Sequence, residues 1–415
     1  MNTLIKYEIK KIITKKSIVF TLPLIIIFVV WLFILPIFQE NVTLPKGKTY
    51  HGMEAVTIMK KKADVLLDSE EINNTILKYQ SIAKDSNNYP VNDSSNIEFK
   101  DTINNSFILP NYEELNFIAN VYSGPQIYVG HPEIRNIRVS SDGFNLYNKL
   151  NINYLNIENG KKLNSSHNYT ISEKEYWVGL TKKIKTPFKI GYQGAWRIII
   201  DRLPFLFIPI LFICILVSQS FINDFQLKTI KVIFPTIKGR KDLAIAKLIS
   251  AYLIGIVYYL VFILLVTVPL FYLYSFKGWD LPIQVQDPSI PYPWTLSQTV
   301  FIHFGLGLII LIGLITFILL ISLFIKKFLP IILLTVCIIL LPTIIPKSSE
   351  FLSYSLLVRL LPITQLNMAY VDWISYDIWG AVFNVYTFNL IIYSLVIILG
   401  IPFIIKKYTQ YELNQ

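Results

Sequence analysis

Residues 17–38 read SIVFTLPLIIIFVVWLFILPIF, an uncharged stretch of 22 residues. A helix rises about 1.5 Å per residue, so about 20 apolar residues are enough to cross the ~30 Å hydrocarbon core of a bilayer. Five further apolar stretches lie at 196–221, 248–274, 299–325, 328–345 and 386–405. We therefore expect an all-α polytopic membrane protein with six transmembrane helices.

The overall composition agrees with this expectation. Hydrophobic residues make up 53% of the chain and charged residues only 16%, whereas soluble domains carry about 25% charge. An ordinary soluble enzyme is therefore excluded as the default class. The two cysteines, Cys214 and Cys337, both lie in apolar stretches, so the polar regions cannot be held by disulfides.

Residues 39–195 form a polar insertion between the first two spans, long enough to be a complete domain. Two helices are expected near its start. The first has Val56, Met59, Ala63, Leu66 and Leu67 at helical spacing, and the second is opened by a capping box at Asp68–Glu71. The second helix should turn these side chains inward: Ile72, Ile76, Leu77 and Ala83. Short apolar runs at 117–122, 134–139 and 152–157 indicate strands. We expect a mixed α/β extracellular domain.

The basic residues indicate the orientation, because cytoplasmic loops near span ends are enriched in Lys and Arg. Six spans place the following segments on one side: 1–16, 222–247, 326–327 and 406–415. These segments hold 15 basic and four acidic residues, and their net charge of +11 equals that of the whole chain. Both termini are therefore expected to be cytoplasmic, and the basic excess does not indicate nucleic-acid binding. The high Ile, Lys and Asn content is typical of AT-rich bacterial genomes, which favours a bacterial cytoplasmic membrane.

Two further segments are expected to lie at the membrane surface. Residues 1–16 predict an amphipathic helix on the cytoplasmic leaflet, with Leu4, Ile5, Ile9, Ile12 and Ile13 on one face. After the short outer loop 275–298, residues 346–385 form an apolar outer segment divided by Pro362. We expect re-entrant or interfacial helices there.

The short loop at 222–247 resembles the corresponding loop of permeases of the ABC-2 type exporters. In that family an acidic residue, a Gly-Thr pair, a hydrophobic stretch ending in Pro, an Arg and a Lys follow the second span. The matching positions here are Asp224, Thr229, Pro235, Arg240 and Lys247, with Lys228 where the glycine usually stands. Arg240 also lies farther beyond Pro235 than is typical of the family.

The resemblance implies a permease subunit that exports a hydrophobic or amphipathic substrate such as a peptide, toxin, drug or lipid-like molecule. It implies a second permease, identical or homologous, and a dimer of cytoplasmic ABC ATPases that bind ATP and Mg²⁺ and contact the 222–247 loop. Asp224, Lys228, Thr229, Pro235, Arg240 and Lys247 would couple the two subunits. A simpler explanation is that the loop's basic residues only set topology and bind anionic lipid.

The residue patterns do not indicate ATP hydrolysis, catalysis or metal binding in this chain. A phosphate-binding loop needs a first glycine where Val42 stands, and only Gly47-Lys48-Thr49 fits its end. No catalytic residue, metal ligand or cofactor is expected, because the histidines lack ligand spacing. Arg197, Asp201 and Arg202, near the outer end of span two, form a candidate outer gate or lipid headgroup contact; snorkelling arginines at a helix end would explain them equally.

Two alternatives to an exporter subunit stay open. A membrane-anchored sensor or immunity protein would use the extracellular domain to bind a ligand. A mechanotransmitting permease of the macrolide-efflux type also has a large outer domain after its first span. That type has four spans, so the number of spans distinguishes it.

Overall fold

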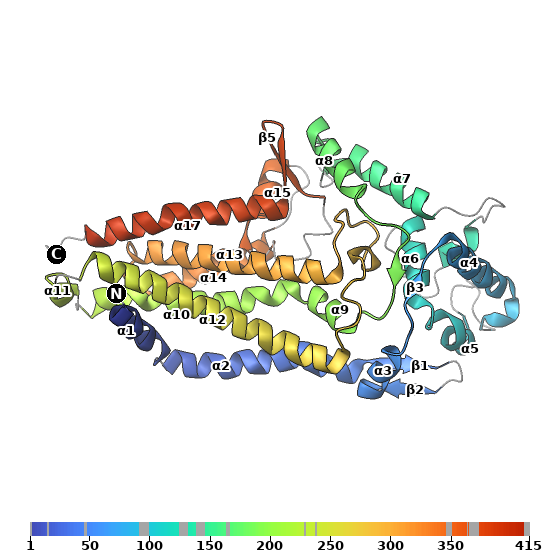
Figure 1. The fold of residues 1–415 in the computed structure, drawn as a ribbon, viewed down its shortest axis with the longest axis horizontal. Helices are drawn as coiled ribbons and strands as arrows, with labels where there is room; N and C mark the ends of the chain where they lie inside the picture. The colour runs from blue at the N-terminus through green and yellow to red at the C-terminus, as the bar shows by residue number, and fades with distance from the viewer. Residues whose placement is uncertain are drawn as a thin grey trace.

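The computed structural model describes most of the chain, and the structural statements below concern these residues: 2–14, 16–44, 48–90, 99–123, 132–137, 146–162, 167–227, 230–236, 239–345, 351–362, 364 and 373–410. The molecule is elongated, with a helical bundle at one end and most of residues 39–195 at the other (Figure 1). The described ends of the chain both lie at the far end of the bundle.

Four helical segments within the described ranges are long and apolar enough to cross a membrane: Leu203–Gln226, Lys241–Tyr274, Leu296–Ser322 and Val385–Thr409. The first comprises η7 (Leu203–Leu206) and α10 (Phe207–Gln226); the others are α12, α13 and α17. The chain is mostly helical, and these four helices are consistent with a membrane protein. α13 packs most extensively against α17 and α10, so the bundle core lies along α13.

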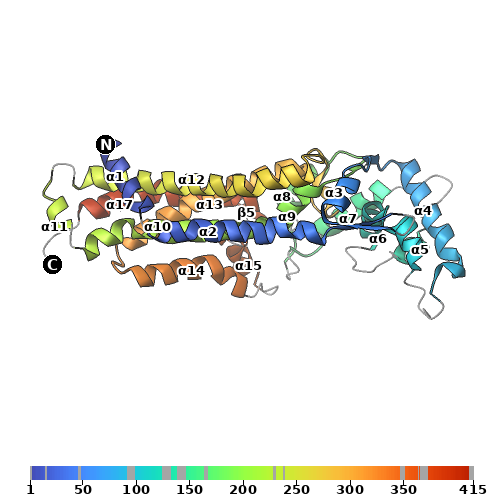
Figure 2. The same ribbon diagram turned by 90° about the horizontal axis from the view of Figure 1, so that it is seen from below.

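Two more apolar helices run beside the bundle (Figure 2). One is α2 (Lys16–Val29), which continues through a π-helical turn, η1 (Val30–Ile34), and a 3₁₀ turn, η2 (Leu35–Gln39). The other is α14 (Phe328–Ile344). Both coincide with expected spans, but their apolar helical stretches are shorter than those of the four long helices. Six spans therefore stay a prediction.

The expected second span begins too early. Residues 196–201 belong to a separate short helix, α9 (Gly194–Asp201), whose backbone leaves the helical conformation at Arg202. Pro204 follows in the first turn of η7, where its missing N–H costs nothing. At the other end of the bundle, α12 starts at Lys241 rather than at 248, so it takes up part of the expected loop.

The region beyond the bundle is mostly helical where it is described. Its helices are α3 (Gly52–Met59), α4 (Ser69–Lys84), η3 (Ser86–Asn88), α5 (Asp101–Ile103), η4 (Asn104–Ile108), α6 (Tyr112–Ser123), η5 (Pro132–Asn136), α7 (Leu146–Asn159) and α8 (Ile171–Thr181). Its strands form two small antiparallel pairs, β1 (Asn41–Thr43) with β2 (Thr49–His51) and β3 (Val65–Leu66) with β4 (Lys189–Ile190).

The strands expected from apolar runs are wrong where the structure describes them. Residues 117–122 lie in α6, 134–136 in η5 and 152–157 in α7. Runs this short cannot distinguish a strand from one turn of a buried helix by periodicity. The first expected helix is right only up to Met59, where α3 ends, because Val65–Leu66 pair with β4 as strand β3. The second expected helix is confirmed as α4: the Asp68 side chain accepts a hydrogen bond from the Glu71 amide at 2.9 Å. Ile72 and Ile76 are buried as expected, whereas Leu77 is exposed.

The segment before α17 contains a hairpin that the sequence analysis did not anticipate. After α15 (Leu352–Val358), strands β5 (Ser375–Ile378) and β6 (Ala381–Asn384) pair antiparallel and lead directly into α17. Trp379 and Gly380 occupy the turn with φ of 51° and 87°, the left-handed conformations of a tight hairpin turn. The remaining short helices are α11 (Ile230–Ile233) and η8 (Ile283–Val285).

Candidate functional site

Three helices bring ionised side chains together at the end of the bundle that carries both chain ends. The amphipathic helix α1 (Asn2–Ile13) packs against α12, and the Ser250 hydroxyl donates to the Ile5 carbonyl at 3.2 Å. Glu8 of α1, Asp224 of α10 and Lys247 of α12 are all buried. Lys11 joins them from the next turn of α1. We call these four residues the ion cluster.

Ion pairs connect the members of the cluster in a continuous chain. Lys247 Nζ lies 2.9 Å from Glu8 Oε2 and 2.8 Å from Asp224 Oδ2. Lys11 Nζ lies 2.7 Å from Asp224 Oδ1. Lys247 Nζ also donates to the Ser220 carbonyl at 2.9 Å. Three segments far apart in sequence are thereby joined by charge.

The cluster is electrically balanced, with two carboxylates and two ammonium groups. Lys247 is 0% exposed, and an unpaired charge at such a site would be very costly. Burial disfavours the Lys11 ammonium, but the Asp224 carboxylate outweighs burial and raises the Lys11 pKa. Removing one member of a buried ion pair typically costs about 3–5 kcal/mol, because the other charge is left uncompensated.

Aromatic side chains hold the loop after α10 against the bundle beside this cluster. Tyr408 of α17 lies 5.1 Å from Phe221 and 5.2 Å from Phe234, measured between ring centroids. Phe225 is 6.5 Å away. Phe234 follows α11 directly and is buried, so it anchors this loop to α10 and α17.

Other side chains of the same loop face outward. Leu227 is 70% exposed and Val232 is 75% exposed, although both are apolar. Pro235 and Arg240 are exposed as well, and the Arg240 guanidinium lies 5.4 Å from the Phe234 ring centroid. The end of the bundle therefore presents a small surface that combines apolar side chains with a positive charge. Figure 1 shows α11 protruding there.

The structure brings together only part of the expected coupling residues. Asp224 and Lys247 meet in the ion cluster, whereas Pro235 and Arg240 lie on the exposed surface. Lys228 and Thr229 lie outside the described residues. Glu8 and Lys11 were missed as site residues, although Glu8 is the one acidic residue of a basic helix and lies on its apolar face with Ile12. An acidic residue on the apolar face of a basic helix was the sequence feature that could have identified Glu8 as a site residue.

The expected outer-gate residues lie at the opposite end of the bundle. Arg197 Nε is 3.8 Å from Asp201 Oδ2, and both side chains are about half exposed. The Arg202 guanidinium lies 5.9 Å from the Phe33 ring centroid. Burial raises the pKa of nearby Glu40, and Arg197 opposes this shift. The i,i+4 pairing expected from the sequence is confirmed, but the pair is open to solvent.

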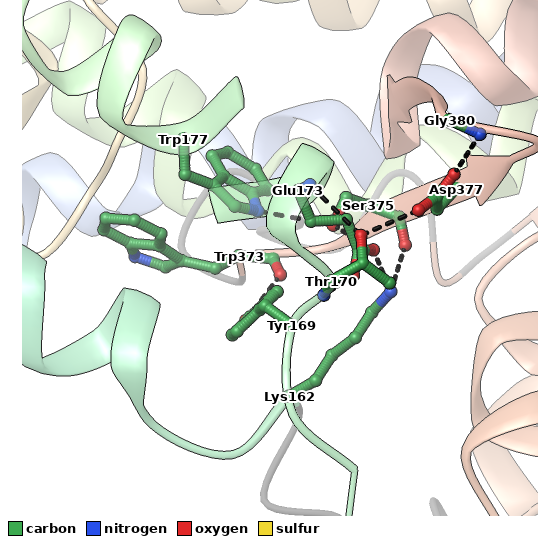
Figure 3. A network of polar contacts seen from close by, with 9 residues as sticks. All are labelled: Lys162, Tyr169, Thr170, Glu173, Trp177, Trp373, Ser375, Asp377 and Gly380. Atoms are coloured by element: carbon green, nitrogen blue, oxygen red, sulfur yellow. Dashed lines mark hydrogen bonds and ion pairs between the residues drawn. The ribbon is translucent and has the colours of Figure 1, made fainter. Parts of the chain in front are cut away.

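A second buried ion pair lies in the region beyond the bundle, residues 39–195, which we call the outer region. Ser375 connects this pair to the hairpin before α17 (Figure 3). Lys162 and Glu173 form this pair. Lys162 Nζ also donates to the Ser375 carbonyl at 2.7 Å, and the Ser375 hydroxyl donates to Glu173 Oε1 at 2.8 Å. Trp177 Nε1 lies 3.3 Å from the same hydroxyl. We call Lys162, Glu173, Trp177 and Ser375 the outer joint.

Further contacts extend the outer joint. Thr170 caps α8 in a full capping box with Glu173, and its hydroxyl donates to Asp377 at 2.7 Å. That bond and one from the Gly380 amide hold the pKa of Asp377 below its usual value. Tyr169 donates to the Trp373 carbonyl at 2.9 Å. α8 and the hairpin are thus fastened together.

Within the described ranges, no three His, Cys, Asp or Glu side chains are grouped so that they could hold a metal ion. Comparisons of the chain with protein families, with curated proteins and with solved structures find no match. Function must therefore be argued from the chain's own geometry.

Proposed function

We propose that the chain is the permease subunit of an ATP-driven ABC-2 type exporter in a bacterial cytoplasmic membrane. The observation that carries this proposal is the exposed loop of Leu227, Val232 and Arg240, anchored to the bundle through Phe234. A soluble partner that bound this loop could move α10, α12 and α1 together, because the ion cluster joins these helices. ATP and Mg²⁺ would act in the partner ATPase, and a second permease would complete the pathway.

The order of the long helices favours this proposal over a permease of the macrolide-efflux type. That type has four spans, with its outer domain after the first. Among the described residues, the four helices long enough to cross a membrane all follow residue 202, and α2 precedes the outer region. A four-span permease of that type has three spans after its outer domain, whereas four long apolar helices follow the outer region here.

Co-purification tests the proposal. The tagged chain is solubilised from its native host, reconstituted in nanodiscs and assayed for bound proteins and ATP hydrolysis. We expect a stoichiometric soluble ATPase. Purification without any ATPase would refute the exporter proposal.

Surface variants can locate the contact without disturbing the core. Val232→Asp places a charge on the exposed apolar surface and should abolish co-purification, because burying an unpaired carboxylate at an interface is costly. Ile171→Asp is the matched control, since Ile171 is equally exposed but lies in the outer region. Asp224 is a poor test residue because its loss would also unbalance the ion cluster. Equal ATPase recovery with both variants would remove the loop from the proposal.

A sensor or immunity protein is the second candidate. The outer region favours it, because a groove between α7 and α8 is large enough for a small molecule. This candidate predicts that an extracellular ligand, rather than an ATPase, is recovered with the chain.

A further inference from the structure

The outer region contains a groove of about 410 Å³ between α7 and α8. Clefts of about 300–1,000 Å³ are typical of small-molecule sites. Leu155 and Val178 line it with apolar surface, and Tyr154, Glu158 and Lys182 contribute polar groups. The groove lies away from the ion cluster and from the exposed loop at the other end of the molecule (Figure 1).

Glu158 is unusual among the buried acids. It is 2% exposed, yet no described residue forms a hydrogen bond or ion pair with it. The other buried carboxylates of the described ranges all have partners: Glu8 and Asp224 bind Lys247, Glu114 accepts from Thr75, and Glu173 binds Lys162. A buried carboxylate without a partner is costly, so its position in the wall of a groove needs an explanation.

Burial raises the pKa of Glu158. Lys182, directly after α8, and Lys174 on α8 oppose this shift without forming an ion pair with Glu158. Lys182 is itself exposed, and Lys174 donates to Asn159 at 3.1 Å. Neither lysine compensates the carboxylate directly. The wall of the groove therefore offers an acceptor for a cation that the chain does not supply.

We propose that this groove binds an organic ammonium ion with an apolar body. The ammonium group pairs with Glu158, and the apolar body covers Leu155 and Val178. A bound cation offsets the desolvation of the carboxylate, and the apolar walls favour a hydrophobic substituent over a bare metal ion or a polyamine. This inference is independent of the export proposal, because it concerns binding to the outer region alone.

The floor of the groove is built to keep its shape. Tyr154 is buried and donates to the Pro288 carbonyl at 2.8 Å, which ties α7 to the loop between α12 and α13. Its ring also lies 5.7 Å from that of Trp373, whose Nε1 donates to the Ser289 carbonyl at 3.0 Å. A preformed floor reduces the ordering cost of binding.

Three probes with one apolar body test the proposal. 4-Phenylbutylamine, 4-phenylbutyrate and 4-phenylbutanol are titrated into the full chain in nanodiscs by calorimetry, with empty nanodiscs subtracted. We expect saturable binding of the amine, and binding at least about tenfold weaker for the acid and the alcohol. Absence of saturable amine binding, or equal binding of the three probes, would overturn the proposal.

Variants of the lining assign the binding to the groove. Glu158→Gln should weaken amine binding at least about tenfold, the usual scale for a hydrogen bond to a charged group. Glu175→Gln is the matched control, because Glu175 is an exposed carboxylate of α8 outside the lining. Unchanged affinity in Glu158→Gln would refute the site.

Two other changes keep the test decisive if Glu158→Gln does not fold. Leu155→Arg adds a cation at a half-exposed lining position and should abolish amine binding. Lys182→Gln removes a positive charge from the lining that repels the ammonium group and should tighten amine binding a few-fold. Amine affinity that stays the same in both variants would place the ligand elsewhere.

Discussion

The ion cluster and the outer joint both connect distant segments through a buried lysine, but they do so with different kinds of contact. Each buries a lysine against a carboxylate and joins segments far apart in the sequence, the cluster through its ion pairs and the joint through Ser375. In the ion cluster, ion pairs make nearly all the connections, and one backbone carbonyl, that of Ser220, assists. The outer joint has one ion pair. Its other connections are hydrogen bonds to the backbone and hydroxyl of Ser375 and the capping box of α8.

This difference predicts different responses to mutation. The cluster depends on charge balance, so loss of one member leaves an uncompensated buried charge and weakens the contacts among α1, α10 and α12. In the joint, Lys162 and Glu173 also bond to Ser375, so each keeps a partner when the other is lost. The end with the ion cluster should therefore respond sharply, and the outer end gradually.

The largest effect is expected for Lys247→Met. Glu8 and Asp224 would then share only Lys11, so we expect a loss of about 3–5 kcal/mol in stability, measured as a lower unfolding midpoint in detergent. Lys241→Met is the control, because Lys241 lies on α12 but is exposed. Adding Glu8→Gln to Lys247→Met rebalances the charge and should recover part of the loss. A midpoint as high as that of the control would contradict the argument.

A smaller effect is expected for Glu173→Gln. Lys162 loses its carboxylate but keeps the Ser375 carbonyl, and Gln can still accept from the Thr170 amide. The cost should therefore be about 3 kcal/mol, the lower end of the range for a broken buried ion pair. Hydrogen exchange should accelerate in 375–384 and in the first turn of α8, but not in α1. Exchange that accelerates equally in α1 would mean that the two ends are not separate units.

Thr170→Ala should cost about 1 kcal/mol, the usual value for a lost helix N-cap. The effect should be confined to faster hydrogen exchange at the start of α8 and in the β5–β6 hairpin. Thr181→Ala, at the end of the same helix, removes a hydroxyl that bonds only to its own helix and serves as the control. No difference between the two variants would show that the cap contributes little.

The smallest effect is expected for Arg197→Ala. Its pair with Asp201 is half exposed and long, and such i,i+4 pairs contribute about 0.5 kcal/mol or less. The unfolding midpoint should hardly change. A loss as large as that of Glu173→Gln would mean that Arg197 has a further role at the outer end of the bundle.

The sequence predicted well what depends on local pattern. Four apolar helices, the cap at Asp68 and the Arg197–Asp201 spacing follow from composition and helical period. It predicted poorly where short apolar runs meet tertiary context: residues 117–122 are helical, and the Trp379–Gly380 hairpin was missed. In the expected coupling site it anticipated Asp224 and Lys247 but not Glu8, which pairs with Lys247, or Lys11, which pairs with Asp224.

By itself, the sequence determined that the chain is helical and suited to a membrane. Exposing long uncharged apolar runs to water is unfavourable, and these runs are long enough to cross a bilayer as helices. Only the tertiary structure decided which buried charges meet. Glu8 and Lys247 are 239 positions apart along the chain, and no local pattern relates them. Their pairing depends on how α1 packs against α12, and the buried position of Glu158 in the wall of its groove depends on how α7 packs beside α8.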